Sequence, residues 1–214
     1  KELLQLQFTT GRNTIFDGVL RLRPGEILTL KDYRIKCSII LDKPVLKKNL
    51  NIEESFEELK ASVFAHQRSD VPYGLFFSGG IDSTLLLYLM SLVNSNPINC
   101  YSVVFEHDDK DIITNICSQF NVNLKFVNFD KNDFWNLLPV VANALDDPII
   151  DYATVPTYKL AQEAKNDLKV VLSGEGGDEI FGGYGRYRTS TRPFFKKEIF
   201  KNGAFKKFKY FDNI

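Results

Sequence analysis

The sequence predicts an α/β fold built on a doubly wound parallel sheet. From residue 73 onward, short apolar runs alternate with segments of helical period that are about ten residues long. This alternation is typical of βαβ units, in which crossover helices cover both faces of a parallel sheet. The hydrophobic period changes near Asn51, where apolar residues begin to recur at helical spacing. We therefore place the start of the α/β region there.

The same patterns predict the individual elements. Strands are expected at four short runs of continuous apolar character, namely 73–77, 98–105, 124–129 and 169–172. Helices are expected at five segments of helical period, namely 51–69, 82–93, 111–120, 134–145 and 154–165. In doubly wound sheets, ligands bind beyond the carboxyl ends of the strands. The loops that begin at Ser78 and Ser173 are therefore where we expect the chemistry.

Composition indicates a soluble globular protein without an overall charge field. The 27 Lys and Arg residues balance the 27 Asp and Glu residues, so no net positive charge attracts nucleic acid or an anionic membrane. Three cysteines, Cys37, Cys100 and Cys117, form no CxxC pair and predict reduced thiols rather than disulfides or a zinc site. No apolar run approaches the roughly 20 residues of a membrane span, and no signal peptide opens the sequence. We expect a cytoplasmic location, and because the sequence begins with Lys1, we expect it to be a piece of something longer.

The first loop, SGGIDS at 78–83, has the composition of an anion-binding turn. Between a strand and a helix, backbone N–H groups and the positive end of the helix dipole converge on an anion. A simple tight turn is the alternative. The loop is not of the GxxxxGK[ST] type, because no lysine follows the glycines. Asp82 would repel a bound phosphate unless a cation lay between them, so it predicts Mg²⁺, with helix capping as the alternative.

The second loop, SGEGGDEIFGGY at 173–184, again follows a buried strand with Ser-Gly. It places Glu175, Asp178 and Glu179 in a turn rich in glycine. Three carboxylates so close together would repel one another, so a metal or a cationic partner is expected. A solvated acidic loop is the alternative, although such a loop would not need to follow a buried strand.

Together the two loops resemble a known family. SGGIDS resembles the pyrophosphate-binding motif of the ATP-pyrophosphatase enzymes, and SGEGGDEIFGGY is similar to the second signature of the asparagine synthetases. Residues 144–164 are similar to the segment that precedes this signature in the glutamine-dependent enzymes. Residues 14–30, TIFDGVLRLRPGEILTL, resemble the last strands of their N-terminal glutaminase domain. The resemblance implies two parts: residues 1–45 as the end of a glutaminase-type domain, and 46–214 as the first part of an ATP-pyrophosphatase domain.

The resemblance also implies roles for individual residues. The pyrophosphate of ATP would be cradled by Ser78, Gly79, Gly80, Asp82 and Ser83. Mg²⁺ would be held by Asp82 and Asp178. The adenosine side would be lined by Phe77, Val103, Ser173 and Gly174, and the reacting centre by Glu175 and Tyr184.

The chemistry implied by the resemblance has two steps. The side-chain carboxylate of aspartate attacks the α-phosphate of ATP and releases pyrophosphate, and ammonia from glutamine then gives asparagine and AMP. Adenylation supplies the leaving group that a carboxylate lacks, and the first loop would stabilise the charge on the departing pyrophosphate. Small molecules are the expected partners, without nucleic acid or membrane, and a homodimer is left open.

The sequence departs from the family pattern at both ends. The family's glutaminase uses an N-terminal cysteine that does not open this sequence, and the family's catalytic lysine is expected beyond Ile214. Three alternatives therefore stay open: a β-lactam-synthetase-like cyclase or another amidotransferase for a different carboxylate, a tRNA-modifying ATP-pyrophosphatase, and a non-catalytic nucleotide-binding module. The lysines and aromatics of residues 192–211 predict amphipathic helices, with nucleic-acid contact as the alternative, and Asp146-Asp147-Pro148 is a candidate substrate contact.

Overall fold

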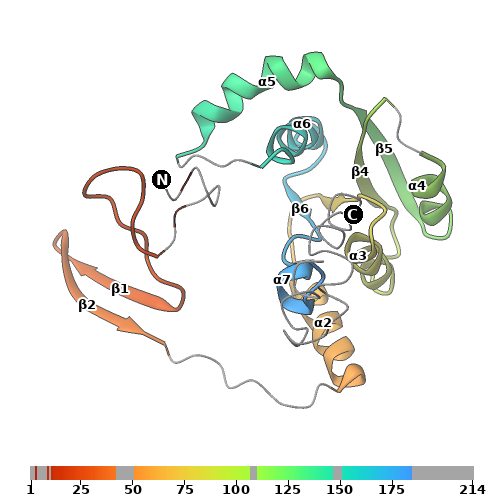
Figure 1. The fold of residues 1–214 in the computed structure, drawn as a ribbon. Helices are drawn as coiled ribbons and strands as arrows, with labels where there is room; N and C mark the ends of the chain where they lie inside the picture. The colour runs from red at the N-terminus through yellow and green to blue at the C-terminus, as the bar shows by residue number, and fades with distance from the viewer. Residues whose placement is uncertain are drawn as a thin grey trace, which may run out of the picture.

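A four-stranded parallel sheet forms the centre of the computed structural model (Figure 1), which describes residues 3, 9, 11–41, 51–106, 110–146 and 151–184. The strand order is β5-β4-β3-β6, and β3 pairs in parallel with both β4 and β6. The strands are β3 (Tyr73–Phe76), β4 (Ile98–Val104), β5 (Val122–Asn128) and β6 (Val170–Leu172). All four lie where their apolar runs predict them.

The five predicted helices are also present. They are α2 (Ile52–His66), α3 (Ile81–Ser91), α4 (Lys110–Cys117), α5 (Lys131–Ala144) and α6 (Thr154–Ala164). The helix starts follow from local capping: the Asn51 side chain accepts hydrogen bonds from the backbone N–H groups of Glu53 and Glu54 at the start of α2. Asp130 and Asp133 form a reciprocal capping box at the start of α5.

One helix was not predicted. The five residues of α7 (Gly177–Phe181) lie inside the second loop, where the sequence indicated only a glycine-rich turn. Gly176 and Gly182 border this helix in the left-handed region, with φ angles of +92° and +68°. Because glycine adopts such angles without steric cost, the chain can enter and leave a very short helix abruptly.

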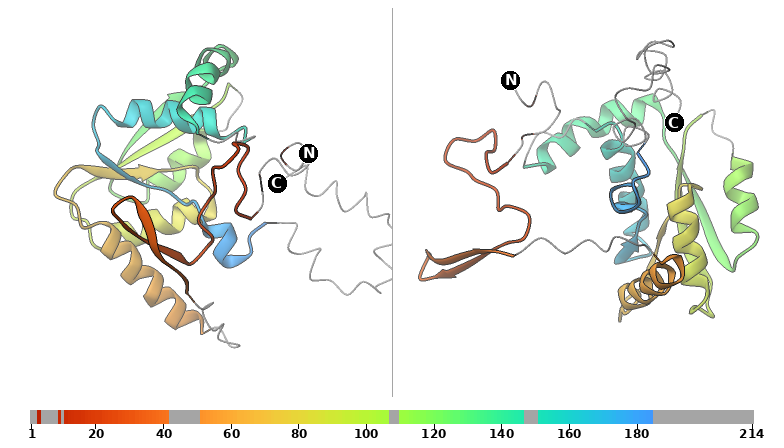
Figure 2. Two further views of the ribbon diagram at one scale, coloured as in Figure 1. Left: turned by 90° about the vertical axis from the view of Figure 1, so that its left-hand side faces the viewer. Right: turned by 60° about the horizontal axis from the view of Figure 1, so that its bottom comes forward.

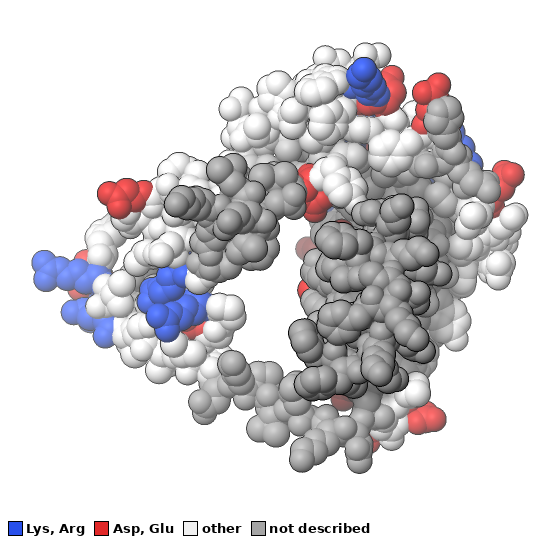
Figure 3. All heavy atoms as spheres, in the orientation of Figure 1, with Lys and Arg blue, Asp and Glu red and all other residues white. Residues whose placement is uncertain are grey.

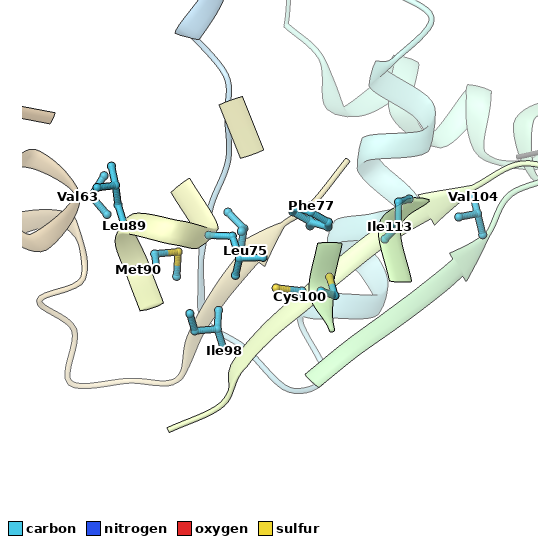
Figure 4. Close-up of a cluster of buried hydrophobic side chains, with 11 residues drawn as sticks. Val63, Leu75, Phe77, Leu89, Met90, Ile98, Cys100, Val104 and Ile113 are labelled. Carbon is cyan, nitrogen blue, oxygen red and sulfur yellow. The ribbon is translucent and has the colours of Figure 1, made fainter. Parts of the chain in front are cut away.

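Helices cover both faces of the sheet, as Figures 1 and 2 show. Side chains of successive strand residues point to opposite faces. Leu75 and Phe77 therefore lie in one core cluster with residues of α2, α3 and α4 (Figure 4). Phe76 lies in a second cluster, with Tyr101 of β4 and Leu160 of α6. The doubly wound α/β prediction is confirmed.

An antiparallel hairpin of β1 (Glu26–Lys31) and β2 (Arg34–Ile40) stands apart from the sheet in Figures 1 and 2. Every residue of β2 is exposed, and Lys and Arg side chains gather over the hairpin in Figure 3. A two-stranded ribbon buries too little apolar surface to be stable alone. The hairpin overlaps residues 14–30, for which the resemblance implies strands, whereas the expected boundary near residue 45 falls within 42–50, outside the described residues.

Candidate functional site

The two glycine-rich loops leave the sheet side by side. Leu75 of β3 is the register partner of Leu172 of β6, and the strands run in the same direction. The residues that follow them therefore emerge at the same edge of the sheet. This places the loop that begins at Ser78 next to the loop that begins at Ser173, as the topology predicts for a ligand site.

Hydrogen bonds within the first loop hold it closed. The Ser83 hydroxyl, whose residue is only 4% exposed, accepts from the backbone N–H of Ser78 at 3.3 Å and donates to the carbonyl of Gly80 at 3.1 Å. The backbone N–H of Gly80 in turn donates to the Ser78 hydroxyl at 3.3 Å. Gly79 adopts a φ of +75°, where other residues are strained. The side chains of the loop therefore hold its backbone at Ser78 and Gly80.

Asp82 lies in the first turn of α3 but does not cap it. The N-cap is Gly80, which has extended backbone and no side-chain capping hydrogen bond. The capping alternative for Asp82 is therefore wrong. Its carboxylate still gains from the positive end of the helix dipole.

The second loop approaches Asp82 directly. A Cβ built on Gly177 would be 2.7 Å from the Asp82 Cγ and 3.0 Å from each carboxylate oxygen. A Cβ built on Gly174 would be 3.1 Å from the Asp82 Cβ and 3.2 Å from the Ser83 nitrogen. Because both positions are glycine, the second loop can pack against the acidic end of the first. The two motifs thus form one site, with Asp82 between them.

One carboxylate of the site, that of Asp82, is available to a magnesium ion that also binds phosphate. Within the described parts of the chain, the half-buried Asp82 carboxylate accepts no hydrogen bond and forms no ion pair. Asp178, the second residue of α7, directs a carboxylate oxygen toward Gly183. No three His, Cys, Asp or Glu side chains gather among these residues. Mg²⁺ is usually bound by one or two carboxylates together with substrate phosphates, and Asp82 offers one such carboxylate.

The remaining predicted residues take different positions around this centre. Ser173 and Glu175 are exposed, whereas the Phe77 side chain is buried in the core, so only its backbone could face a ligand. Val103 is half-buried near the end of β4 and packs against the two core clusters on the α5 and α6 side. The Tyr184 hydroxyl donates a hydrogen bond of 2.6 Å to the Glu179 carboxylate.

Sequence reasoning missed two contacts of the site. Gly177 was not singled out, although its lack of a side chain leaves room for the Asp82 carboxylate. Ile113 of α4 was also missed, and its Cγ1 would be 3.1 Å from a Cβ on Gly79. No local pattern could have identified either contact, because each joins segments that are far apart in the sequence. Of the predicted substrate contact at Asp146-Asp147-Pro148, Asp147 and Pro148 lie outside the described residues, as does the segment 192–211.

Comparison with known proteins identifies the family of this site. Residues 55–209, which contain both loops, match the family model described as asparagine synthase. The chain belongs to the asparagine synthase family. It is 32% identical to the glutamine-hydrolyzing asparagine synthetase 1 of Bacillus subtilis over 204 residues, which cover 91% of this chain and 32% of that protein. It is 35% identical to the putative glutamine-hydrolyzing asparagine synthetase 2 of Methanocaldococcus jannaschii over 192 residues, which cover 88% of this chain and 36% of that protein.

The asparagine synthase match has a limited extent. The chain spans about a third of the length of these curated relatives. Among solved structures, it is similar to the NH3-dependent NAD synthetase of Campylobacter jejuni, with a TM-score of 0.42 and 14% identity, over 63% of this chain and 61% of that one. None of the helices in the described part of the chain has the length and apolar character needed to span a bilayer.

Proposed function

We propose that this chain carries the ATP-binding centre of an amide-forming synthetase that adenylates the side-chain carboxylate of aspartate. The observation that supports this most is the meeting of the two loops at Asp82, where Gly174 and Gly177 lie against its side chain. A closed anion-binding turn and the Asp82 carboxylate, which has no hydrogen-bond or ion-pair partner among the described residues, then occupy the same edge of the sheet. Membership of the asparagine synthase family agrees with this reading.

The proposed roles follow from these positions. The pyrophosphate of ATP would contact the turn formed by Ser78, Gly79, Gly80, Asp82 and Ser83. Ser78 is exposed and can reach a ligand, whereas the Ser83 hydroxyl already bonds within the loop. On the adenosine side we place Val103, Ser173, Gly174 and the backbone of Phe77. Asp82 and Asp178 would hold Mg²⁺, which neutralises phosphate charge when it is bound.

The residues would favour the step in which pyrophosphate leaves. Negative charge develops on the departing group, and preorganised N–H donors at the start of α3 stabilise charge more than mobile water does. We place Glu175 and Tyr184 at the reacting centre, where the carboxylate becomes an acyl-adenylate and ammonia then forms the amide. The Tyr184 hydroxyl bonds Glu179 in this structure, so Glu179 would orient that hydroxyl.

The wider assignment is part of the same proposal. Residues 1–45 would be the end of a glutaminase-type domain that supplies ammonia from glutamine, and 46–214 would begin the synthetase domain. The β1–β2 hairpin supports the first part, because a ribbon with so little burial is expected to belong to a larger β-structure. We propose a cytoplasmic enzyme whose partners are small-molecule substrates.

Isotope exchange between pyrophosphate and ATP tests the proposal. With the full-length protein and Mg²⁺, labelled pyrophosphate should enter ATP when aspartate is present. The label enters because the acyl-adenylate, once formed, can react with pyrophosphate to regenerate ATP. Glutamate and asparagine serve as matched controls that should not support exchange. Exchange with a different carboxylate alone would move the assignment to another amidotransferase, and no exchange despite tight ATP binding would favour a non-catalytic module.

A further inference from the structure

Ile113 of α4 lies directly against the glycine turn of the first loop. Its Cγ1 would be 3.1 Å from a Cβ built on Gly79, so the two residues are in close contact. Ile113 is 8% exposed and belongs to the same core cluster as Phe77, the last residue before the loop (Figure 4). The turn is thus supported from the core by a side chain outside both motifs.

The helix that carries Ile113 is itself anchored to the sheet. Cys117 lies one helical turn later on the same face of α4, is 3% exposed, and shares the core cluster with Cys100 of β4. Residues at positions i and i+4 move together on a helix. A shift of α4 relative to β4 would therefore change the position of Ile113 beneath Gly79.

Gly79 needs such support more than its neighbours do. The serine hydrogen bonds fix the backbone at Ser78 and Gly80 but not at Gly79, which has a φ of +75°. A glycine can leave this conformation at little cost, because it samples positive and negative φ angles almost equally. Ile113 removes the space on the core side into which the peptide could move.

We propose that Ile113 is a positioning residue that keeps Gly79 in the conformation in which the backbone N–H groups at the start of α3 face an anion. This inference rests on the proposed function, since the anion is taken to be the pyrophosphate group of ATP. The helix α4 would then set how large a fraction of the protein is ready to bind. The apparent affinity for pyrophosphate falls in proportion to that fraction.

Pyrophosphate binding to the full-length protein tests this role. We expect Ile113→Ala to raise the Kd for pyrophosphate about tenfold, as a tenfold smaller competent fraction would require. Ile113→Val keeps Cγ1 and should bind within about twofold of the unsubstituted protein. Ile116→Ala is the matched control, because Ile116 packs against the same cluster from the same helix without being in contact with the loop glycines. If Ile113→Ala weakens binding no more than Ile116→Ala does, the inference is wrong.

Amide hydrogen exchange without ligand provides a second readout. Ile113→Ala should speed exchange at Ser78 and Gly80, whose backbone N–H groups donate the hydrogen bonds of the loop, whereas Ile116→Ala should leave these two amides unchanged. Equal exchange in both variants would contradict the proposal even if binding changed. If the unsubstituted protein binds neither pyrophosphate nor ATP, the proposed function is wrong. The amide hydrogen exchange then still shows whether Ile113 holds the loop.

Discussion

Gly174 of the second loop and Asp82 of the first are in direct contact, since a Cβ on Gly174 would lie 3.1 Å from the Asp82 Cβ. This separation is tighter than nine in ten Cβ contacts, so Gly174→Ala requires Asp82 and the second loop to shift apart by a few tenths of an ångström. We expect Mg·ATP affinity to fall at least about tenfold, while the free energy of unfolding falls by about 1–3 kcal/mol, the usual cost of overpacking. Calorimetric titration and urea unfolding measure the two effects. Unchanged affinity would mean that the second loop does not take part in nucleotide binding.

Asp82 should contribute more to the binding of Mg²⁺ than to the binding of phosphate. Asp82→Asn removes the charge but keeps the shape, so we expect Mg·ATP affinity to drop at least about tenfold. Metal-free pyrophosphate should bind equally well or better, because the carboxylate no longer repels it.

Asp70→Asn is the control for this variant. Asp70 is an exposed aspartate just before β3, at the opposite end of the strand from the site. Titrations of each variant with pyrophosphate, with and without Mg²⁺, separate the two effects. If Mg²⁺ strengthens binding to Asp82→Asn as much as it strengthens binding to the unsubstituted protein, Asp82 is not a metal ligand.

The ion pair between Asp133 of α5 and Lys159 of α6 predicts a pH dependence of stability. Their side chains meet at 2.5 Å, and the hydrogen bond from Lys159 is the main cause that lowers the pKa of Asp133 below 3.8. A lowered pKa in the folded state gives stability that is present above 3.8 and is lost as pH falls through the folded value.

A double-mutant cycle measures this pair. With Asp133→Asn and Lys159→Met, we expect a coupling free energy of about 1 kcal/mol at neutral pH, typical of a partly exposed pair. The coupling free energy should decrease in acid, below pH 3.8. Lys60 and Glu57, an exposed pair on α2 at 3.4 Å, provide a control cycle that should give less. A coupling free energy that increased in acid would contradict the lowered pKa of Asp133.

The three cysteines should react with thiol reagents in two classes. Cys37 on β2 is exposed, whereas Cys100 and Cys117 are buried. Burial raises the pKa of Cys100 to about 12, so at neutral pH it holds almost no reactive thiolate. In a disulfide-exchange assay we expect one thiol to react quickly in the folded protein and the other two only after unfolding. Fast labelling of Cys100 in a Cys37→Ser variant would contradict this.

The sheet was predictable because each strand and helix carries its own periodic pattern. The segment around β3 is a continuous apolar run because helices cover both faces of the sheet. Leu75 and Phe77 are buried on one face, and Phe76 packs on the other. The loop positions then followed from the rule for parallel sheets. The contact between the loops could not be predicted from the sequence, because nothing in the local sequence around Gly177 indicates that it lies against Asp82.

The helix α7 and its side-chain bonds were missed for a related reason. Five residues are too few to show a helical period, and the glycines at the ends of α7 predict a turn when the sequence is considered locally. The bond from Tyr184 to Glu179 depends on that helix, so it was missed as well. Asp82 was recognised as acidic and near a phosphate site, but the alternative role as a cap could be rejected only once Gly80 was seen at that position.

The strand order has a consequence for how the protein reaches its native state. Gly74 of β3 pairs with Val171 of β6, about a hundred residues later in the chain, and pairings of such long sequence separation are slow to form. During synthesis the first loop emerges well before the second, and it has no contact for Asp82 until β6 joins the sheet. The proposed ATP binding should therefore appear together with the slowest step of folding, so it would mark chains whose sheet is complete.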